Sequence, residues 1–168
     1  MVNKIFEKMQ QIEVIKQQNS STLTTEQYTL HKENSNIYKF FDFCAGIGSE
    51  QLAFKNLGLE CVGYSEIDIK AEETYKLFHG NQFKNYGDLM QINPQNLEDF
   101  EILLSGFPCQ AFSIAGKRRG FEDERGQIIY GLSEIIKVKK PKAFLLENVK
   151  GLVNINNGKT LKDILALL

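Results

Sequence analysis

The spacing of apolar positions along the chain changes at residue 37. Residues 3–18 place Ile5, Met9 and Ile12 at helical intervals, which predicts a short amphipathic helix. Residues 19–36 are polar and rich in turn formers, a composition typical of a linker or a loosely ordered arm. From Ile37 onward, short apolar runs alternate with amphipathic segments. We therefore predict an N-terminal helix and linker over 1–36, followed by a folded domain that starts at 37.

The alternation within this domain predicts strands and helices in turn. We expect strands at 38–43, 61–65, 101–105 and 142–146, and helices at 49–57, 70–79, 126–138 and 160–168. Ser49 is expected to be the N-cap of the first helix, which ends at Gly58, and Gly80 ends the second. Asn157 and Gly158 form the turn before the last helix.

This order of elements predicts an α/β fold with a doubly wound, mostly parallel, Rossmann-like sheet covered by helices on both faces. Ligands of such sheets bind outside the carboxyl ends of the strands. The chain stops in an apolar helix after four clear strands. We therefore expect a fold that is incomplete at its C-terminus.

The bulk composition narrows the class of protein only a little. With 42% hydrophobic and 24% charged residues, the 168-residue chain has the composition of a soluble globular protein. Its net charge of −1 gives no sign of a nucleic-acid partner, so a local basic patch would have to supply that attraction. Three widely spaced cysteines, Cys44, Cys61 and Cys109, support neither a disulfide framework nor a metal site and fit a reducing cytoplasm. No apolar run is long enough for a membrane span, and no signal peptide is expected.

Three motifs together suit an adenosine-bearing cofactor. In D-F-C-A-G-I-G-S (42–49), Gly46 and Gly48 permit positive φ and close approach of a ligand to the backbone at a helix amino terminus. Glu66 in Y-S-E-I-D (64–68) follows about twenty residues later, where nucleotide-binding folds place an acid on the ribose hydroxyls. Asp88 in G-D-L (87–89) is positioned to accept from an adenine amino group. Each motif alone also fits a tight turn without ligand or a solvated carboxylate.

A fourth motif, G-F-P-C-Q-A-F-S (106–113), places Cys109 in a loop just past a buried strand. Cysteine is a nucleophile as the thiolate, although by residue type alone a buried structural cysteine is the commoner case. Pro108 stiffens this turn, and Gln110 and Ser113 add polar groups to the same loop. This setting favours a reactive Cys109, whereas Cys61 has the surroundings of an ordinary strand residue.

Two further motifs complete the set. E-N-V (147–149) puts Glu147 at the end of the last strand, where its carboxyl could hold or protonate a ring nitrogen or simply accept from loop N–H groups. The segment 115–126 has glycines around Lys117, Arg118 and Arg119. It is interpreted as a mobile basic loop that closes over a phosphate backbone, although residues 122–124 are acidic and nearly cancel its charge.

The motifs from residue 38 to about 160, in this order, resemble those of the bacterial cytosine-5 DNA methyltransferases of restriction–modification systems. The resemblance implies that 37–168 is the first part of an S-adenosylmethionine-dependent catalytic domain. It implies that Cys109 adds to C6 of a cytosine flipped out of double-stranded DNA. It also implies that Glu147 contacts N3 and the amino group while C5 receives the methyl group, and that no metal takes part.

The same resemblance assigns two sets of binding residues. The expected cofactor ligands are Asp42, Phe43, Cys44, Ala45, Gly46, Gly48, Glu66, Ile67, Asp88, Leu89 and Pro108. The expected DNA contacts are Gln110, Ser113, Lys117, Arg118, Arg119 and Arg125. The chain departs from the family at Cys44, where an aromatic residue usually stacks on the adenine. It also lacks the family's Q-x-R-x-R segment, its target recognition domain and its late G-N segment.

Our first functional hypothesis is therefore the amino-terminal part of a cytoplasmic bacterial DNA (cytosine-5) methyltransferase. This part is expected to be inactive or nearly so alone. It fits either a truncated product or half of a split enzyme, which a second chain carrying the missing half and the target recognition domain would complete. The alternative from another class is a non-catalytic fragment that binds a cofactor or a partner. An RNA cytosine-5 methyltransferase of the same fold is a third reading, which the F-S after P-C-Q-A disfavours.

Overall fold

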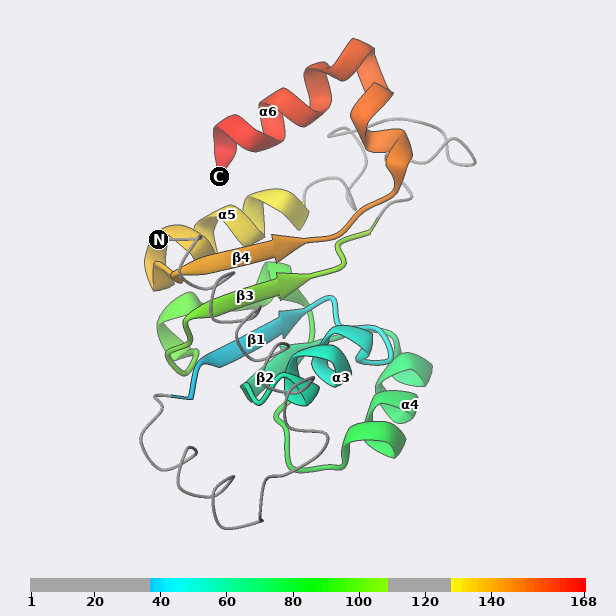
Figure 1. The fold of residues 1–168 in the computed structure, drawn as a ribbon, viewed down its shortest axis with the longest axis vertical. Helices are drawn as coiled ribbons and strands as arrows, with labels where there is room; N and C mark the ends of the chain where they lie inside the picture. Colours follow the sequence, from blue (N-terminus) through cyan, green and yellow to red (C-terminus); the bar gives the residue numbers. More distant parts are fainter. Residues whose placement is uncertain (1–36, 109–127) are drawn as a thin grey trace, which may run out of the picture.

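The computed structural model of the protein describes residues 37–108 and 128–168 (Figure 1). Within these residues the chain forms one parallel sheet in the order β2-β1-β3-β4. The strands are β1 (Lys39–Phe43), β2 (Glu60–Ser65), β3 (Ile102–Ser105) and β4 (Ala143–Leu146). The predicted helix 3–18, the linker 19–36 and the loop that begins at Cys109 lie outside the described residues.

Helices connect the strands, as the alternation predicted. They are α3 (Ser49–Asn56), α4 (Ile69–His79), α5 (Ile128–Lys139) and α6 (Lys159–Leu167). The 3-10 helices at Leu89–Gln91, Pro94–Asn96 and Lys150–Gly158 were not predicted. The first two span only three residues each, which leaves little periodicity to detect. The doubly wound α/β fold is thus confirmed for the described part of the chain.

The start of α3 corrects one prediction. Ser49 is not the N-cap: that position is Gly48, at φ 84° and ψ 38°, and no side chain caps the helix. A side-chain cap requires extended backbone at the cap residue, but here the chain enters the helix from a left-handed turn. The Ser49 hydroxyl instead donates to Glu50 Oε2 at 2.8 Å. By contrast, the predicted glycines past the ends of α3 and α4 are present in left-handed conformations.

Alternate residues of β1 point to opposite faces of the sheet and create a core on each side. Phe41 and Phe43 pack with Leu103 on the face covered by α5. Phe40 packs with Leu104 and with Phe54 of α3 on the other face. The helices α3 and α5 therefore lie on opposite faces of the sheet, and the connection direction reverses between β1 and β3. In such folds the crevice at this reversal point is where ligands bind.

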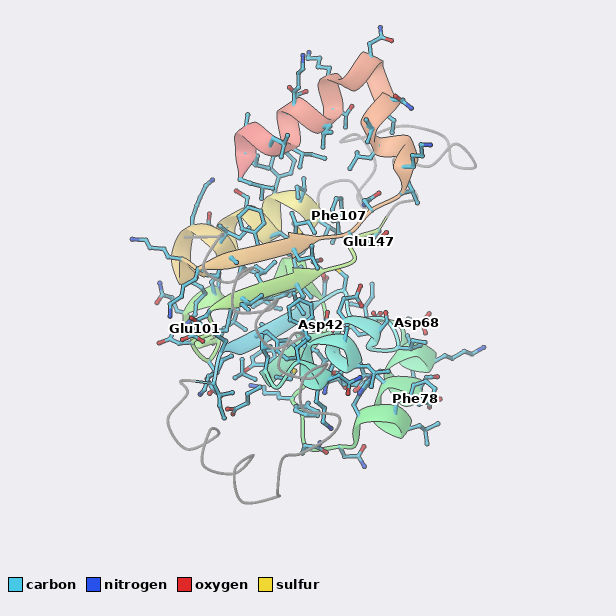
Figure 2. All side chains as sticks on the ribbon, viewed as in Figure 1. Asp42, Asp68, Phe78, Glu101, Phe107 and Glu147 are labelled. Atoms are coloured by element: carbon cyan, nitrogen blue, oxygen red, sulfur yellow. The ribbon has the colours of Figure 1, made fainter. Side chains whose placement is uncertain are left out.

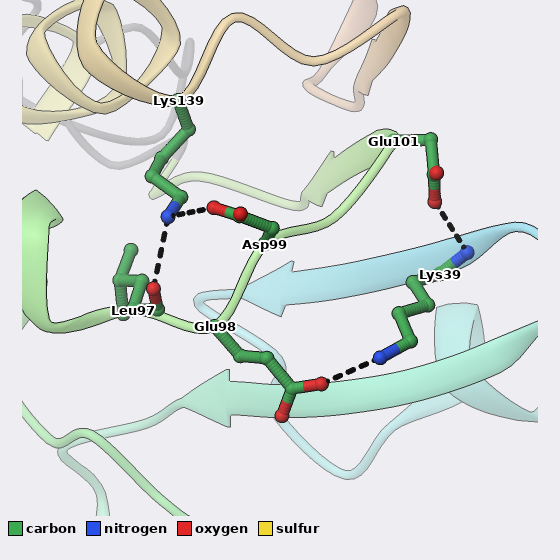
Figure 3. Close-up of polar contacts among 6 residues, drawn as sticks. All are labelled: Lys39, Leu97, Glu98, Asp99, Glu101 and Lys139. Carbon is green, nitrogen blue, oxygen red and sulfur yellow. Dashed lines mark hydrogen bonds and ion pairs between the residues drawn. The ribbon is translucent and has the colours of Figure 1, made fainter.

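Ion pairs gather at the amino ends of the strands, opposite to that crevice (Figure 3). The Lys39 backbone N–H donates to Glu101 Oε2 at 2.9 Å, and its ammonium group pairs with Glu98 at 2.7 Å. At the end of α5, Lys139 Nζ donates to the Leu97 carbonyl at 2.9 Å and pairs with Asp99 at 2.5 Å. These contacts fasten the loop that leads into β3 to the rest of the domain.

Candidate active site

The register of the sheet makes all four strands end level. Phe43 pairs with Ser65 on one side and with Ser105 on the other, and Ser105 pairs with Leu146. The residues that come next in the sequence are Cys44, Glu66, Gly106 and Glu147. Four motifs that are far apart in the chain are thereby brought to one edge of the sheet, as the sequence analysis expected.

The turn from β1 to α3 uses its two glycines differently. Gly46 has φ 56°, and a Cβ added there would meet no atom within 4 Å. Gly48 has φ 84°, and an added Cβ would overlap the ring of His79 and approach Tyr75 Cδ2 to 2.8 Å. Gly48 is therefore needed for packing against α4, whereas the open face of Gly46 is free to approach a ligand.

Glu66 ties the second motif to the first. Its Oε2 accepts from the Gly46 N–H at 2.7 Å, and its Oε1 accepts from the N–H groups of Ile67 and Asp68, both at 2.8 Å. An ionised carboxylate has about four acceptor sites, so acceptor capacity remains for another donor. The carboxylate is thus held rigidly at the mouth of the glycine turn.

Asn85 holds Glu66 in place, and the sequence analysis missed it. Its side-chain oxygen accepts from the N–H groups of Glu66 at 3.0 Å and Gly87 at 2.9 Å. Its amide nitrogen donates to the Glu66 carbonyl at 3.0 Å. An asparagine two residues before a glycine turn is a weak local signal, because its long-range partner becomes evident only in the folded chain.

Asp88 follows the segment in which Asn85 bridges to Tyr64 of β2. Its Oδ1 accepts from the Met90 N–H at 2.9 Å and caps the 3-10 helix that starts at Leu89. Burial raises the pKa of the Cys44 thiol to about 12, and the nearby carboxylates of Glu66 and Asp88 contribute to that shift. Cys44 is therefore a neutral thiol at physiological pH. Its left-handed backbone, with φ 54°, is unusual for a residue other than glycine.

A group of buried polar side chains lies on the α3 face, behind the turn. Asp42, Gln51, Tyr64 and Tyr75 are each 0% exposed, and their terminal oxygen and nitrogen atoms have no hydrogen-bond partner among the described residues. Burial raises the pKa of Asp42 well above its ordinary value, and the negative charges of Glu50 and Glu66 add to this effect. The neutral form of the Asp42 carboxyl is thus favoured beneath the turn, and no local sequence pattern predicted its polar neighbours.

The third and fourth strand ends form the other wall of the site. The Glu147 N–H donates to the Ser105 carbonyl at 2.9 Å, and Asn148 Nδ2 donates to the Phe107 carbonyl at 3.0 Å. Phe107 and Glu147 are neighbours at the carboxyl ends of β3 and β4 (Figure 2). Pro108 follows on this wall and is half-buried. The Glu147 carboxyl itself is exposed.

The remaining predicted residues divide into two sets. Phe43, Ala45 and Leu89 are buried, whereas Ile67 is 72% exposed beside Glu66. Seven predicted residues lie outside the described ranges, and their roles stay predictions: Cys109, Gln110, Ser113, Lys117, Arg118, Arg119 and Arg125. Across 37–108 and 128–168, no three His, Cys, Asp or Glu side chains are grouped to hold a metal ion. In the same ranges no helix is both long and apolar enough to cross a membrane.

Comparison with known proteins assigns the family. The model of the C-5 cytosine-specific DNA methylase family matches residues 38–168. The chain therefore belongs to this family, as the order of its motifs indicated.

Curated relatives agree with this assignment. The chain is 48% identical over 149 residues to the type II methyltransferase M.HpaII of Haemophilus parainfluenzae, a match that covers 84% of this chain and 41% of that protein. It is 44% identical over 126 residues to M.HhaI of Haemophilus parahaemolyticus, with 75% and 38% covered. The chain thus spans about two fifths of the length of these relatives.

Solved structures agree on the fold. A DNA modification methyltransferase encoded within an E. coli prophage aligns with a TM-score of 0.62 at 22% identity, over 78% of this chain and 37% of that one. The Dnmt2 methyltransferase of S. pombe aligns with a TM-score of 0.58, also at 22% identity, over 77% and 41%. At this level of identity the likeness supports the fold alone.

Proposed function

We propose that this chain forms the cofactor-binding and nucleophile-bearing part of a DNA (cytosine-5) methyltransferase in a bacterial restriction–modification system. The observation that carries the proposal is the hydrogen bond from the Gly46 N–H to Glu66 Oε2. It joins the glycine turn and the acidic residue on the sheet edge that also presents Gly106 and Glu147. Family membership gives this arrangement its chemical meaning.

We propose S-adenosylmethionine as the cofactor, and the described residues fit it. Glu66 keeps acceptor capacity for the ribose hydroxyls, and Asp88 Oδ2 accepts no hydrogen bond from any described residue and is available to the adenine amino group. The open face of Gly46 admits close approach to the backbone. The thiol of Cys44 offers less stacking surface than an aromatic ring. The apolar side chains of Ile67 and Leu89 would then contribute more of the adenine contact.

The reaction that follows from this proposal begins at Cys109. Its thiolate forms a bond to C6 of the flipped cytosine, and the ring electrons move to C5 while Glu147 donates to N3. When bound, the cofactor would supply the electrophilic methyl group that C5 attacks, with the S–CH3 bond broken and S-adenosylhomocysteine as the leaving group. Removal of the C5 proton then returns the electrons to the ring and breaks the C6–sulfur bond, which restores the Cys109 thiolate. Pro108 and Phe107 would form the wall that separates the base from the cofactor.

The proposal extends to partners and to cellular setting. Double-stranded DNA is the expected substrate, contacted by Gln110 and Ser113 and by the basic side chains of Lys117, Arg118, Arg119 and Arg125. A target recognition domain would determine which DNA sequence is methylated, and the enzyme would act in the bacterial cytoplasm.

The test is transfer of a tritiated methyl group to DNA. The chain is assayed alone and together with the product of the reading frame that follows it, with Cys109→Ser as the variant and Cys61→Ser as the matched control. We expect transfer that the Cys109→Ser variant abolishes and the Cys61→Ser variant retains, because Cys61 lies near the amino end of β2, away from the carboxyl ends of the strands. Methyl transfer that survives Cys109→Ser would contradict the proposed mechanism.

A further inference from the structure

A glutamate in the first turn of α3 reaches across the crevice to the opposite wall. Glu50 Oε1 lies 3.4 Å from the position that a Cβ on Gly106 would occupy. Glu147 Oε2 lies 3.7 Å from the same position. Two carboxylates from different motifs therefore converge on a gap that the glycine at 106 leaves open.

The hydrogen bonds of Glu50 satisfy only one of its two oxygens. Oε2 accepts from the Ser49 hydroxyl at 2.8 Å, whereas Oε1 accepts from no described residue. The ion pairs formed within 37–108 and 128–168 also leave Glu50 without a cation. Glu50 is half-buried, and its Oε1 is open to a donor from outside the described residues.

The surroundings of Glu50 favour a cationic donor. Asp42 lies behind the turn at 0% exposure, with neither carboxyl oxygen hydrogen-bonded to a described residue. Of the charged groups that raise the pKa of Asp42, Glu50 has the largest effect and Glu66 follows. Glu50, Glu66 and Glu147 thus create a negative potential at the carboxyl ends of the strands, and a positively charged ligand would be attracted to it.

We propose that Glu50 Oε1 accepts a hydrogen bond from the α-ammonium group of the methionine part of S-adenosylmethionine. This inference rests on the proposed function. The cofactor carries two positive groups, a sulfonium and an ammonium, but only the ammonium has N–H donors. Glu66 and Asp88 occupy the adenosine end of the crevice, so Glu50, at the Gly106 gap, is placed to receive the other end. Glu50 would then be a ligand that fixes the direction in which the methionine part lies.

The test compares three ligands by isothermal titration calorimetry with the full chain. S-adenosylmethionine has both positive groups, S-adenosylhomocysteine has only the ammonium, and 5′-methylthioadenosine has neither. The variant is Glu50→Gln, and Glu73→Gln on the exposed face of α4 is the control with the same change of charge. We expect Glu50→Gln to weaken both ammonium-bearing ligands about tenfold or more and to leave 5′-methylthioadenosine binding unchanged within about twofold. The control should weaken none of them.

Other outcomes would overturn the inference in distinguishable ways. Loss for S-adenosylmethionine alone would place the sulfonium, not the ammonium, at Glu50. Equal loss for all three ligands would indicate a purely structural role, and unchanged binding would exclude any contact. Failure of the unaltered chain to bind any of the three would contradict the proposed cofactor itself, and the inference would fall with it.

Discussion

The two faces of the sheet differ in the kind of side chain that β1 buries on each. On the α5 face, Phe41 and Phe43 of β1 stack with ring centroids 4.2 Å apart, and Phe100 and Leu103 complete an apolar core. Asp42 lies between these two phenylalanines in the sequence, and its side chain is buried on the opposite face of the sheet, which α3 covers. Its neighbours on that face include three more polar side chains without described partners.

The contrast indicates which face carries stability and which carries the site. Apolar burial on the α5 face is favourable at about 25 cal/mol per Å². Each unsatisfied polar group on the α3 face costs about 1–3 kcal/mol. The costly groups lie directly beneath the glycine turn proposed to hold the cofactor. Natural proteins tend to break local packing rules at functional sites, so this placement agrees with the proposed function.

The largest effect is expected from the apolar face. Phe41→Ala removes a fully buried ring that contacts Phe43, Tyr86 and Phe100. We expect a loss of about 3–5 kcal/mol in the free energy of unfolding, since the cavity adds to the lost burial. Urea titration followed by circular dichroism measures this loss. The control is Phe144→Ala on β4, where the side chain is 44% exposed, and an equal loss in both variants would contradict the assignment of the core.

The next prediction compares Gly48 and Gly46, the two glycines of the turn between β1 and α3, by the stability that alanine costs at each. Gly48→Ala forces a Cβ into His79 and Tyr75 at a positive φ, and we expect it to cost about 2–4 kcal/mol of stability. Gly46→Ala meets only the backbone penalty of about 1–2 kcal/mol, because its Cβ would stand in open space.

For cofactor affinity, the larger loss should come from Gly46→Ala and not from Gly48→Ala. If the cofactor contacts the open face of Gly46, the loss in binding free energy for S-adenosylmethionine in Gly46→Ala is larger than the loss in the free energy of unfolding. Thermal unfolding and calorimetry on the same samples separate the two effects. A Gly46→Ala variant that binds the cofactor as tightly as the unaltered chain would remove this turn from the proposed site.

The sequence predicted the frame of this molecule well, for physical reasons that particular residues show. Alternating short apolar runs and amphipathic segments placed β1 to β4 and α3 to α6 within two residues of their observed bounds. Because the carboxyl ends of parallel strands meet at one edge of the sheet, Glu66, Asp88 and Glu147 were also expected at one edge. Local pattern suffices for such features because period and chain order determine them.

Features that depend on distant partners were not predictable in the same way. The failure of Ser49 as a cap depends on Gly48 packing against α4. The role of Asn85 depends on contact with Glu66, 19 residues away. The polar group around Asp42 joins residues from two strands and two helices. No periodicity in a single segment reports such contacts, which exist only after the elements have packed.

The last effect, that of Asp42→Asn on the free energy of unfolding, has the opposite sign from that of Phe41→Ala and depends on pH. Asp42 has a pKa raised well above its ordinary value, chiefly by burial. The folded protein is therefore more stable when this carboxyl is protonated. The unfolded carboxyl titrates near pH 3.9, so above that pH unfolding releases a proton and stability falls as pH rises towards the folded pKa. Below the unfolded pKa this loss is absent.

Asp42→Asn replaces the carboxyl with a neutral group of the same shape. We expect the variant to match the unaltered chain near pH 4 and to become more stable at higher pH, by about 1–3 kcal/mol once the folded carboxyl ionises. Urea midpoints measured from pH 4 to pH 9 give the difference curve, with Asp163→Asn on the exposed side of α6 as the matched control. Phe41→Ala, one residue away on the apolar face, should lower stability at every pH. Parallel curves for the unaltered chain and Asp42→Asn would show that the buried carboxyl has a partner, and that the two faces are less different than their packing indicates.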